Sequence, residues 1–197
     1  MIDINVTKWP VIIYSNYRTG STALGHYLSK KYNTPYFNEP FYRPNVMDEF
    51  LKVYNSGDSH YIIKFMADHI HEDDLYNQLL ALDAYKIRLY RANKVEQITS
   101  YYVASMTKRW RTYQHDNVDD YMLPFDKDMM LESFRRIIYN DQLLDEANID
   151  FDLTTDYESL GYLDDADLVL TKQPKNFDQL KQIVTGFMNS KFNKVSK

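Results

Sequence analysis

Cysteine is absent from this chain of 197 residues. That absence excludes disulfide bonds, cysteine metal sites and thiol catalysis, and it fits a protein of a reducing compartment. Long apolar runs are absent as well, since no stretch approaches the roughly 18 residues that a membrane-spanning helix needs. The first ten residues also lack the charged and apolar regions of a signal peptide. We therefore expect a cytoplasmic protein with no membrane partner.

Positive charge is in short supply too, with 23 Lys and Arg against 28 Asp and Glu, and a formal net charge of -5. Nucleic-acid-binding domains are normally basic, so we expect no nucleic-acid partner, although a local basic pocket is compatible with this balance. The histidines and carboxylates show no metal-ligand spacing, and no metal site is predicted. Without repeats or a Gly/Ser linker, the length predicts a single domain over residues 1–197.

Short apolar runs alternate with amphipathic segments along the chain. Strands are predicted at 11–15, 61–66, 86–91 and 151–155, and helices after the first strand, at 72–82, after Asn93, at 127–147 and around 180–188. Strands that alternate with helices favour right-handed crossovers and a parallel sheet covered on both faces. The sequence therefore predicts a three-layer α/β domain, with a central, mostly parallel sheet of about 4–5 strands flanked by helices.

The turn between the first strand and the next helix, Asn16–Thr22, reads NYRTGST. Ligands bind beyond the carboxyl ends of the strands in such a sheet, and Gly20 lets the backbone come close to one. The first N–H groups of the following helix make an anion site, to which Ser21 and Thr22 add hydroxyls and Arg18 a planar fork. The turn is P-loop-like but lacks the first glycine and the lysine of a Walker motif. The alternative is a helix capped by Ser or Thr, with Arg18 exposed.

A second basic strand end follows at Arg91, and Ser100 lies on the helix after it. Such an arginine and serine could hold a second anion at the same edge of the sheet. The alternative is a surface arginine and a helical serine bonded to its own backbone.

Together, YSNYRTGST (14–22) and YRANKVEQITSYYVA (90–104) resemble the two signatures of sulfotransferases that use 3′-phosphoadenosine 5′-phosphosulfate (PAPS). The similarity is greatest to the bacterial branch that sulfates carbohydrates such as trehalose, and shorter similarities, among them DYESL (156–160), occur in order along the chain. The resemblance implies that the loop binds the 5′-phosphosulfate and the second stretch the 3′-phosphate. The implied donor-binding residues are Arg18, Thr19, Gly20, Ser21 and Thr22, then Arg91 with Ser100, or with Thr99 in its place.

The resemblance also implies a general base. Animal cytosolic members carry a histidine after the third strand, but the matching place here reads Lys64-Phe65-Met66. In the bacterial carbohydrate branch a glutamate after the loop accepts the proton, and Glu39 stands in that place. Pro40 predicts an extended conformation for Glu39. Lys64 either reaches the transferring sulfuryl group or lies along the sheet with its amine in water.

The expected function is transfer of the sulfuryl group of PAPS to an acceptor hydroxyl, with 3′,5′-diphosphoadenosine as the second product. A small molecule or a carbohydrate is the expected partner, and carbohydrate is favoured by analogy alone. The oligomeric state is open. Two other functions compete: a P-loop-type nucleotide-dependent kinase, and a non-catalytic nucleotide-binding module on the same scaffold.

Overall fold

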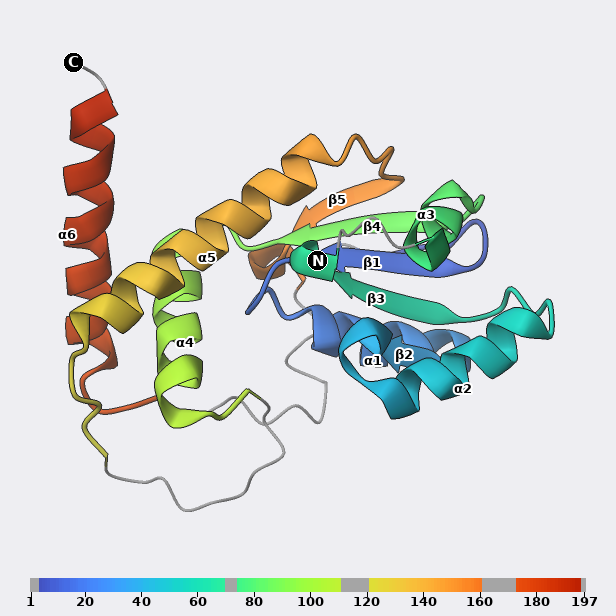
Figure 1. Cartoon of the computed structure of the whole chain (residues 1–197), viewed down its shortest axis with the longest axis horizontal. Helices are drawn as coiled ribbons and strands as arrows, with labels where there is room; N and C mark the ends of the chain where they lie inside the picture. The colour runs from blue at the N-terminus through green and yellow to red at the C-terminus, as the bar shows by residue number, and fades with distance from the viewer. Residues whose placement is uncertain (1–3, 70–73, 111–120, 161–172, 196–197) are drawn as a thin grey trace. The chain divides into compact units, whose positions relative to one another are not determined.

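The structure, a computed structural model, describes residues 4–69, 74–110, 121–160 and 173–195 (Figure 1). The chain divides into two compact units: Met1–Ala92 with Asn140–Ala166, and Asn93–Tyr139 with Asp167–Lys197. Two compact units can belong to one domain, so the single domain expected over residues 1–197 stays a prediction.

The first unit holds a sheet of five strands, all parallel, in the order β2-β3-β1-β4-β5. The strands are β1 (Val11–Ser15), β2 (Tyr36–Asn38), β3 (Ile62–Met66), β4 (Tyr85–Tyr90) and β5 (Leu153–Asp156). This sheet, flanked by helices, confirms the predicted three-layer α/β architecture. Four of the strands lie within two residues of their predicted places at each end, and β2 was not predicted.

The helices are α1 (Ser21–Tyr32), α2 (Pro44–Asn55), α3 (Asp74–Ala81), α4 (Lys94–Thr107), α5 (Lys127–Glu146) and α6 (Phe177–Val195). Short 3-10 helices follow three strands: η1 (Pro40–Tyr42), η2 (Ala67–His69) and η3 (Tyr157–Ser159). Helix α5 begins in the second unit and ends in the first. Across these described parts of the chain, no helix combines the length and the apolar character of a membrane span.

Strand β1 is central because its sequence, VIIYS, is apolar on both sides, and all five of its residues are buried. Such continuous apolar runs are typical of parallel strands with helices on both faces. Ile12 and Tyr14 point to one face, where side chains of α2, α3 and the end of α5 complete the core. Val11 and Ile13 point to the other face, which Leu24 and Leu28 of α1 cover.

Helix α4 opens the second unit, and Asn93 and Glu96 form a reciprocal cap at its start. The Glu96 N–H donates to Asn93 Oδ1 at 3.1 Å, and Asn93 Nδ2 donates to Glu96 Oε2 at 3.3 Å. Within the same unit, the Tyr102 hydroxyl donates to the Pro124 carbonyl at 2.8 Å and accepts from the Asp126 N–H at 2.8 Å. Tyr102 is therefore a buried structural residue of the second unit.

Candidate functional site

Four strands of the first unit bring the candidate residues together. The Asn16–Thr22 loop follows β1, Glu39 follows β2, and Arg91 follows β4, while Lys64 lies within β3. Because the strands are parallel, their carboxyl ends meet at one edge of the sheet. In β3, Lys64 lies on the same face as Ile62, which is the face that α1 covers.

The loop after β1 is a tight turn held by its own first residue. Asn16 Oδ1 accepts the Tyr17 N–H at 2.7 Å, and the Asn16 carbonyl accepts the Thr19 hydroxyl at 3.0 Å. Arg18 and Gly20 both have left-handed backbones, with φ of 59° and 74°. Gly20 is the N-cap of α1 and makes no side-chain cap. The alternative of a helix capped by Ser or Thr is therefore wrong.

A tyrosine from the far edge of the sheet covers Gly20. A Cβ atom added at Gly20 would lie 2.4 Å from Cδ2 and 2.6 Å from Cε2 of Tyr157, in η3. The loop thus needs glycine at this position twice over, for the positive φ and for the contact with the ring. The Tyr157 ring occupies the space beside the α-carbon of Gly20, where a ligand was expected to approach the backbone. That approach therefore stays a prediction.

Arg91 lies against this loop and contacts the backbone of Arg18. Arg91 Nη1 donates to the Arg18 carbonyl at 3.2 Å, and the Arg91 guanidinium lies 4.8 Å from the centre of the Tyr157 ring. The Arg91 side chain is only 13 % exposed, and its Nε is 3.6 Å from Glu158 Oε1. The alternative of a surface arginine is therefore wrong for Arg91.

The electrostatics of this pair favour an anion. Burial in the first place, and the charge of Arg91 in the second, lower the pKa of the Arg18 guanidinium below its usual value. Arginine stays charged at neutral pH all the same. Two partly buried positive charges that repel each other are stabilised when an anion binds between or beside them. The capped-helix alternative required an exposed Arg18, whereas Arg18 is half-buried.

Lys64 joins the loop to Glu39. Its Nζ donates to Thr22 Oγ1 at 2.9 Å and to Glu39 Oε1 at 2.7 Å. Lys64 is 3 % exposed, so the alternative in which its amine lies in water is wrong. A buried lysine is stable where charged and polar partners compensate for the lost hydration, and Glu39 and Thr22 do so here.

Glu39 corrects one prediction. Its backbone is left-handed, with φ 55° and ψ 56°, and is not extended. The preference for an extended backbone that a following proline imposes is therefore overridden at Glu39, whose carboxylate is held by two ion pairs. Besides Lys64, Arg43 donates from Nη2 to Glu39 Oε2 at 3.1 Å. A non-glycine residue in this region costs about 1–3 kcal/mol and often marks a functional site.

Thr99 and Ser100 belong to α4 in the second unit. The Thr99 hydroxyl donates to the Val95 carbonyl at 2.7 Å and is committed to its own helix. Ser100 is half-buried on the same helix. That either of them shares an anion with Arg91 stays a prediction.

Sequence reasoning missed three contributors to the site: Arg43, Tyr157 and Glu158. The last two lie in the DYESL segment, where Glu158 Oε2 also accepts the Ala92 N–H at 3.0 Å. Arg43 carries a signal of its own, because it stands four residues after Glu39 and can reach back to it. Within the described ranges, no group of three or more His, Asp or Glu side chains is arranged to hold a metal ion.

The arrangement can bind an anion and move a proton. Arg18, Arg91 and the start of α1 suit a phosphate or a sulfate. The Lys64 ammonium bridges the Glu39 carboxylate and the Thr22 hydroxyl of the loop, which places a proton acceptor close to the anion site. No protein-family model matches the chain, and no curated protein sequence matches it either.

Proposed function

We propose that the chain is a sulfotransferase that moves the sulfuryl group of PAPS to an acceptor hydroxyl. The observation that carries the proposal is the juxtaposition of two unlike devices at one edge of the sheet. One is the arginine pair beside the loop, and the other is the Lys64–Glu39 ion pair that is hydrogen-bonded to Thr22. An anion-binding module alone has no use for a carboxylate so close to the anion. A cytoplasmic location, expected from the missing cysteines, belongs to the same proposal.

The residues present suit a donor with negative charge at two ends. Arg18 and the first N–H groups of α1 would hold the 5′-phosphosulfate, and Arg91 would hold the 3′-phosphate. Bound there, PAPS supplies a sulfuryl group on a good leaving group. Arg18 stabilises the charge that grows on the leaving phosphate, which is the main catalytic contribution expected of such a site.

Glu39 and Lys64 would serve the acceptor side. As the acceptor oxygen forms its bond to sulfur, the bond from sulfur to the 5′-phosphate oxygen breaks, and the acceptor proton goes to the Glu39 carboxylate. Lys64 holds that carboxylate in place at 2.7 Å and can also donate to a sulfuryl oxygen. Arg43 fixes the other carboxylate oxygen, so that the base has one orientation.

Thermal unfolding with 3′,5′-diphosphoadenosine, with ADP and with ATP plus Mg²⁺ tests the donor site. Nucleotide at 100 times its dissociation constant adds about 2.7 kcal/mol of stability. For a chain of this length, that corresponds to a melting temperature roughly 5–11 °C higher. We expect the shift with 3′,5′-diphosphoadenosine only, with loss in Arg91→Ala and retention in the control Arg136→Ala, whose side chain is exposed on α5. A shift with ATP and Mg²⁺ alone would favour the kinase.

Turnover tests the base. Glu39→Gln keeps the size of the side chain and removes its charge, so we expect intact nucleotide binding and a loss of turnover of about 10²-fold or more. Glu49→Gln, at an exposed position on α2, is the matched control. Nucleotide binding with equal turnover in both variants would leave Glu39 without a catalytic role. Binding with no turnover in the wild-type chain, for any acceptor class, would favour the non-catalytic module.

A further inference from the structure

We propose that Lys64 couples the binding of the donor to the activity of the base. Its ammonium holds the Glu39 carboxylate while the loop is empty and passes to the donor when an anion binds at the loop. This inference rests on the proposed function, because it assigns the regulation of the same site. The base then becomes fully active only after the donor has bound.

The Lys64 ammonium has one partner on the donor side and one on the base side. Nζ donates to Thr22 Oγ1 at 2.9 Å and to Glu39 Oε1 at 2.7 Å. Thr22 is the second residue of α1, whose first N–H groups suit an anion. An anion bound at the loop therefore competes with Glu39 for the same ammonium.

Burial and charge favour the anion in this competition. The Lys64 side chain is buried and that of Glu39 is 19 % exposed, so water weakens their attraction little. Glu39 also shares its single charge with Arg43, which donates from Nη2 to Oε2 at 3.1 Å. A phosphosulfate carries more negative charge than one carboxylate and has more oxygens to accept from an ammonium.

The proton affinity of the base depends on which partner Lys64 holds. A cation beside a carboxylate favours its charged form, so Glu39 is a weak proton acceptor while both Lys64 and Arg43 hold it. Transfer of the ammonium to the donor removes one of these cations from the carboxylate. As the acceptor oxygen bonds to sulfur and the bond from sulfur to the donor phosphate oxygen breaks, the acceptor proton then goes to Glu39.

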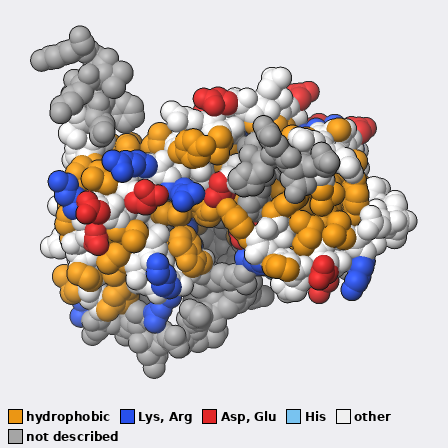
Figure 2. Space-filling model, viewed as in Figure 1, with side chains coloured by type: hydrophobic (Ala, Val, Ile, Leu, Met, Phe, Trp, Pro, Cys, Tyr) orange, Lys and Arg blue, Asp and Glu red, His pale blue; other side chains and the backbone are white. Residues whose placement is uncertain are grey.

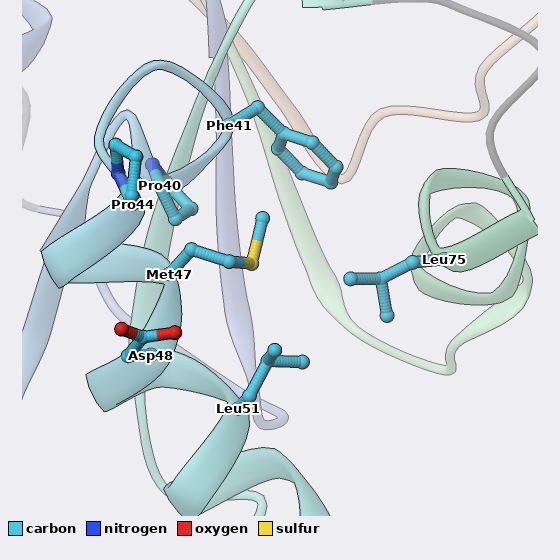
Figure 3. A pocket seen from close by; sticks show the side chains of 7 residues that line it. All are labelled: Pro40, Phe41, Pro44, Met47, Asp48, Leu51 and Leu75. Carbon is cyan, nitrogen blue, oxygen red and sulfur yellow. The ribbon is translucent and has the colours of Figure 1, made fainter.

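The backbone that carries Glu39 is anchored apart from Lys64. The Tyr42 N–H donates to the Glu39 carbonyl at 3.1 Å. Phe41 packs on the face of the sheet opposite Lys64, where it lines a hollow with side chains of α2 and α3 (Figure 3). Figure 2 shows hydrophobic side chains gathered between these two helices. Glu39 can therefore lose Lys64 and keep its place, with Arg43 still on its other oxygen.

Affinity for 3′,5′-diphosphoadenosine, measured by calorimetry at one salt concentration, tests the exchange without any acceptor. Glu39→Gln keeps an oxygen that accepts from the lysine but removes the charge that competes with the donor. We expect this variant to bind the nucleotide at least about fivefold more tightly than the wild type, the lower end of usual couplings between two sites. Glu49→Gln changes the net charge equally at an exposed position and leaves the affinity unchanged.

Neutral replacements of Lys64 separate the exchange from plain charge repulsion. In Lys64→Met no ammonium is left to pass to the donor, so adding Glu39→Gln brings no gain in affinity. Plain repulsion by the Glu39 carboxylate would bring the same gain in every background. Lys64→Gln repeats the test with a polar side chain, should the methionine variant not fold. Arg43→Met leaves the lysine on Glu39, and we expect no gain there either.

The outcomes separate the two proposals. If the wild type binds 3′,5′-diphosphoadenosine and Glu39→Gln binds it no more tightly, the exchange is refuted and the sulfotransferase proposal stands. A gain that persists without the lysine, or an equal gain in Arg43→Met, refutes the role of Lys64 in the same way. If none of the proteins binds the nucleotide, the sulfotransferase proposal fails, and the role of Lys64 fails with it.

Discussion

Replacing Gly20 with alanine tests the geometry of the loop most directly. Gly20 has φ 74°, and its missing Cβ leaves the place that the Tyr157 ring occupies. A left-handed alanine costs roughly 1–2 kcal/mol, and an extra carbon in a packed space costs typically about 1–3 kcal/mol. Alanine also stiffens the unfolded chain, which returns about 0.4–1 kcal/mol. We therefore expect Gly20→Ala to lower the free energy of unfolding by about 2–4 kcal/mol.

A second background separates the two contributions. In Tyr157→Ala the ring is gone, and Gly20→Ala then costs only the backbone term, about 1 kcal/mol after the unfolded-state gain. The coupling between the two positions is then about 1–3 kcal/mol, measured as a double-mutant cycle in urea. Gly186→Ala is the control, since Gly186 lies in α6 and, among the described residues outside its own stretch of helix backbone, no atom is within 4 Å of a Cβ added there. Alanine there stabilises the helix by about 0.5–1 kcal/mol.

Two results would refute this reasoning. An equal cost of Gly20→Ala with and without the Tyr157 ring means that the ring does not cover the loop. A cost below that of an ordinary surface substitution, about 0.5 kcal/mol, means that Gly20 is not held in the left-handed conformation.

Three further predictions concern single side chains. Burial raises the pKa of Tyr61 to about 12. Because the folded-state pKa lies above the unfolded value near 10, the stabilisation is complete below pH 10 and is lost as the pH rises toward 12. Phenylalanine does not titrate, so we expect the unfolding free energy, measured in urea, to fall less between pH 9 and pH 12 in Tyr61→Phe than in the wild type, and an equal fall in both proteins contradicts this. Asn93→Ala removes the side-chain cap of α4 and lowers the unfolding free energy, measured in urea, by about 1 kcal/mol. Asn93→Asp can still cap the helix, so it retains most of the stability that the cap provides. Lys64→Met breaks the ion pair with Glu39 but leaves the one between Glu39 and Arg43, and it lowers the unfolding free energy by about 1–3 kcal/mol. In the double variant with Glu39→Gln the loss is smaller than the sum of the two single losses, as a double-mutant cycle in urea measures; additive losses would mean that the pair is not coupled.

Strand and helix types were predictable where the hydrophobic pattern was strong. The run at 11–15 is apolar on both faces, and parallel sheets bury such runs in their centre. Strand β2 was missed because it has only three residues at the edge of the sheet, too few for a period to show. Helix α2 was not predicted either, although its sequence favours a helix: Pro44 stands at its first position, and apolar residues recur at helical spacing from Val46 to Tyr54.

The site was predictable in its members more than in its contacts. Parallel strands bring their carboxyl ends together whatever the details, so the nearness of Arg18 and Arg91 follows from topology. Glu39 was singled out by the family resemblance alone, because the strand before it was not predicted. The ring of Tyr157 over Gly20 depends on tertiary packing between segments that are more than 130 residues apart, and no local pattern encodes it. The left-handed backbone of Glu39 is likewise a tertiary feature, and it goes against the simple expectation from Pro40.

The position of β1 in the sheet has a consequence for synthesis of the chain. Of the five strands of this sheet it is synthesised first, and its neighbours β3 and β4 begin only at Ile62 and Tyr85. Until Tyr90 has emerged, the apolar VIIYS segment lacks at least one of the two strands that bury it. At about 5–20 residues per second, this exposure lasts several seconds, a period in which chaperones can bind the segment and nascent chains can associate. A ribosome stalled before residue 60 should therefore present β1 as a chaperone-binding segment, and one stalled well beyond β4 should not.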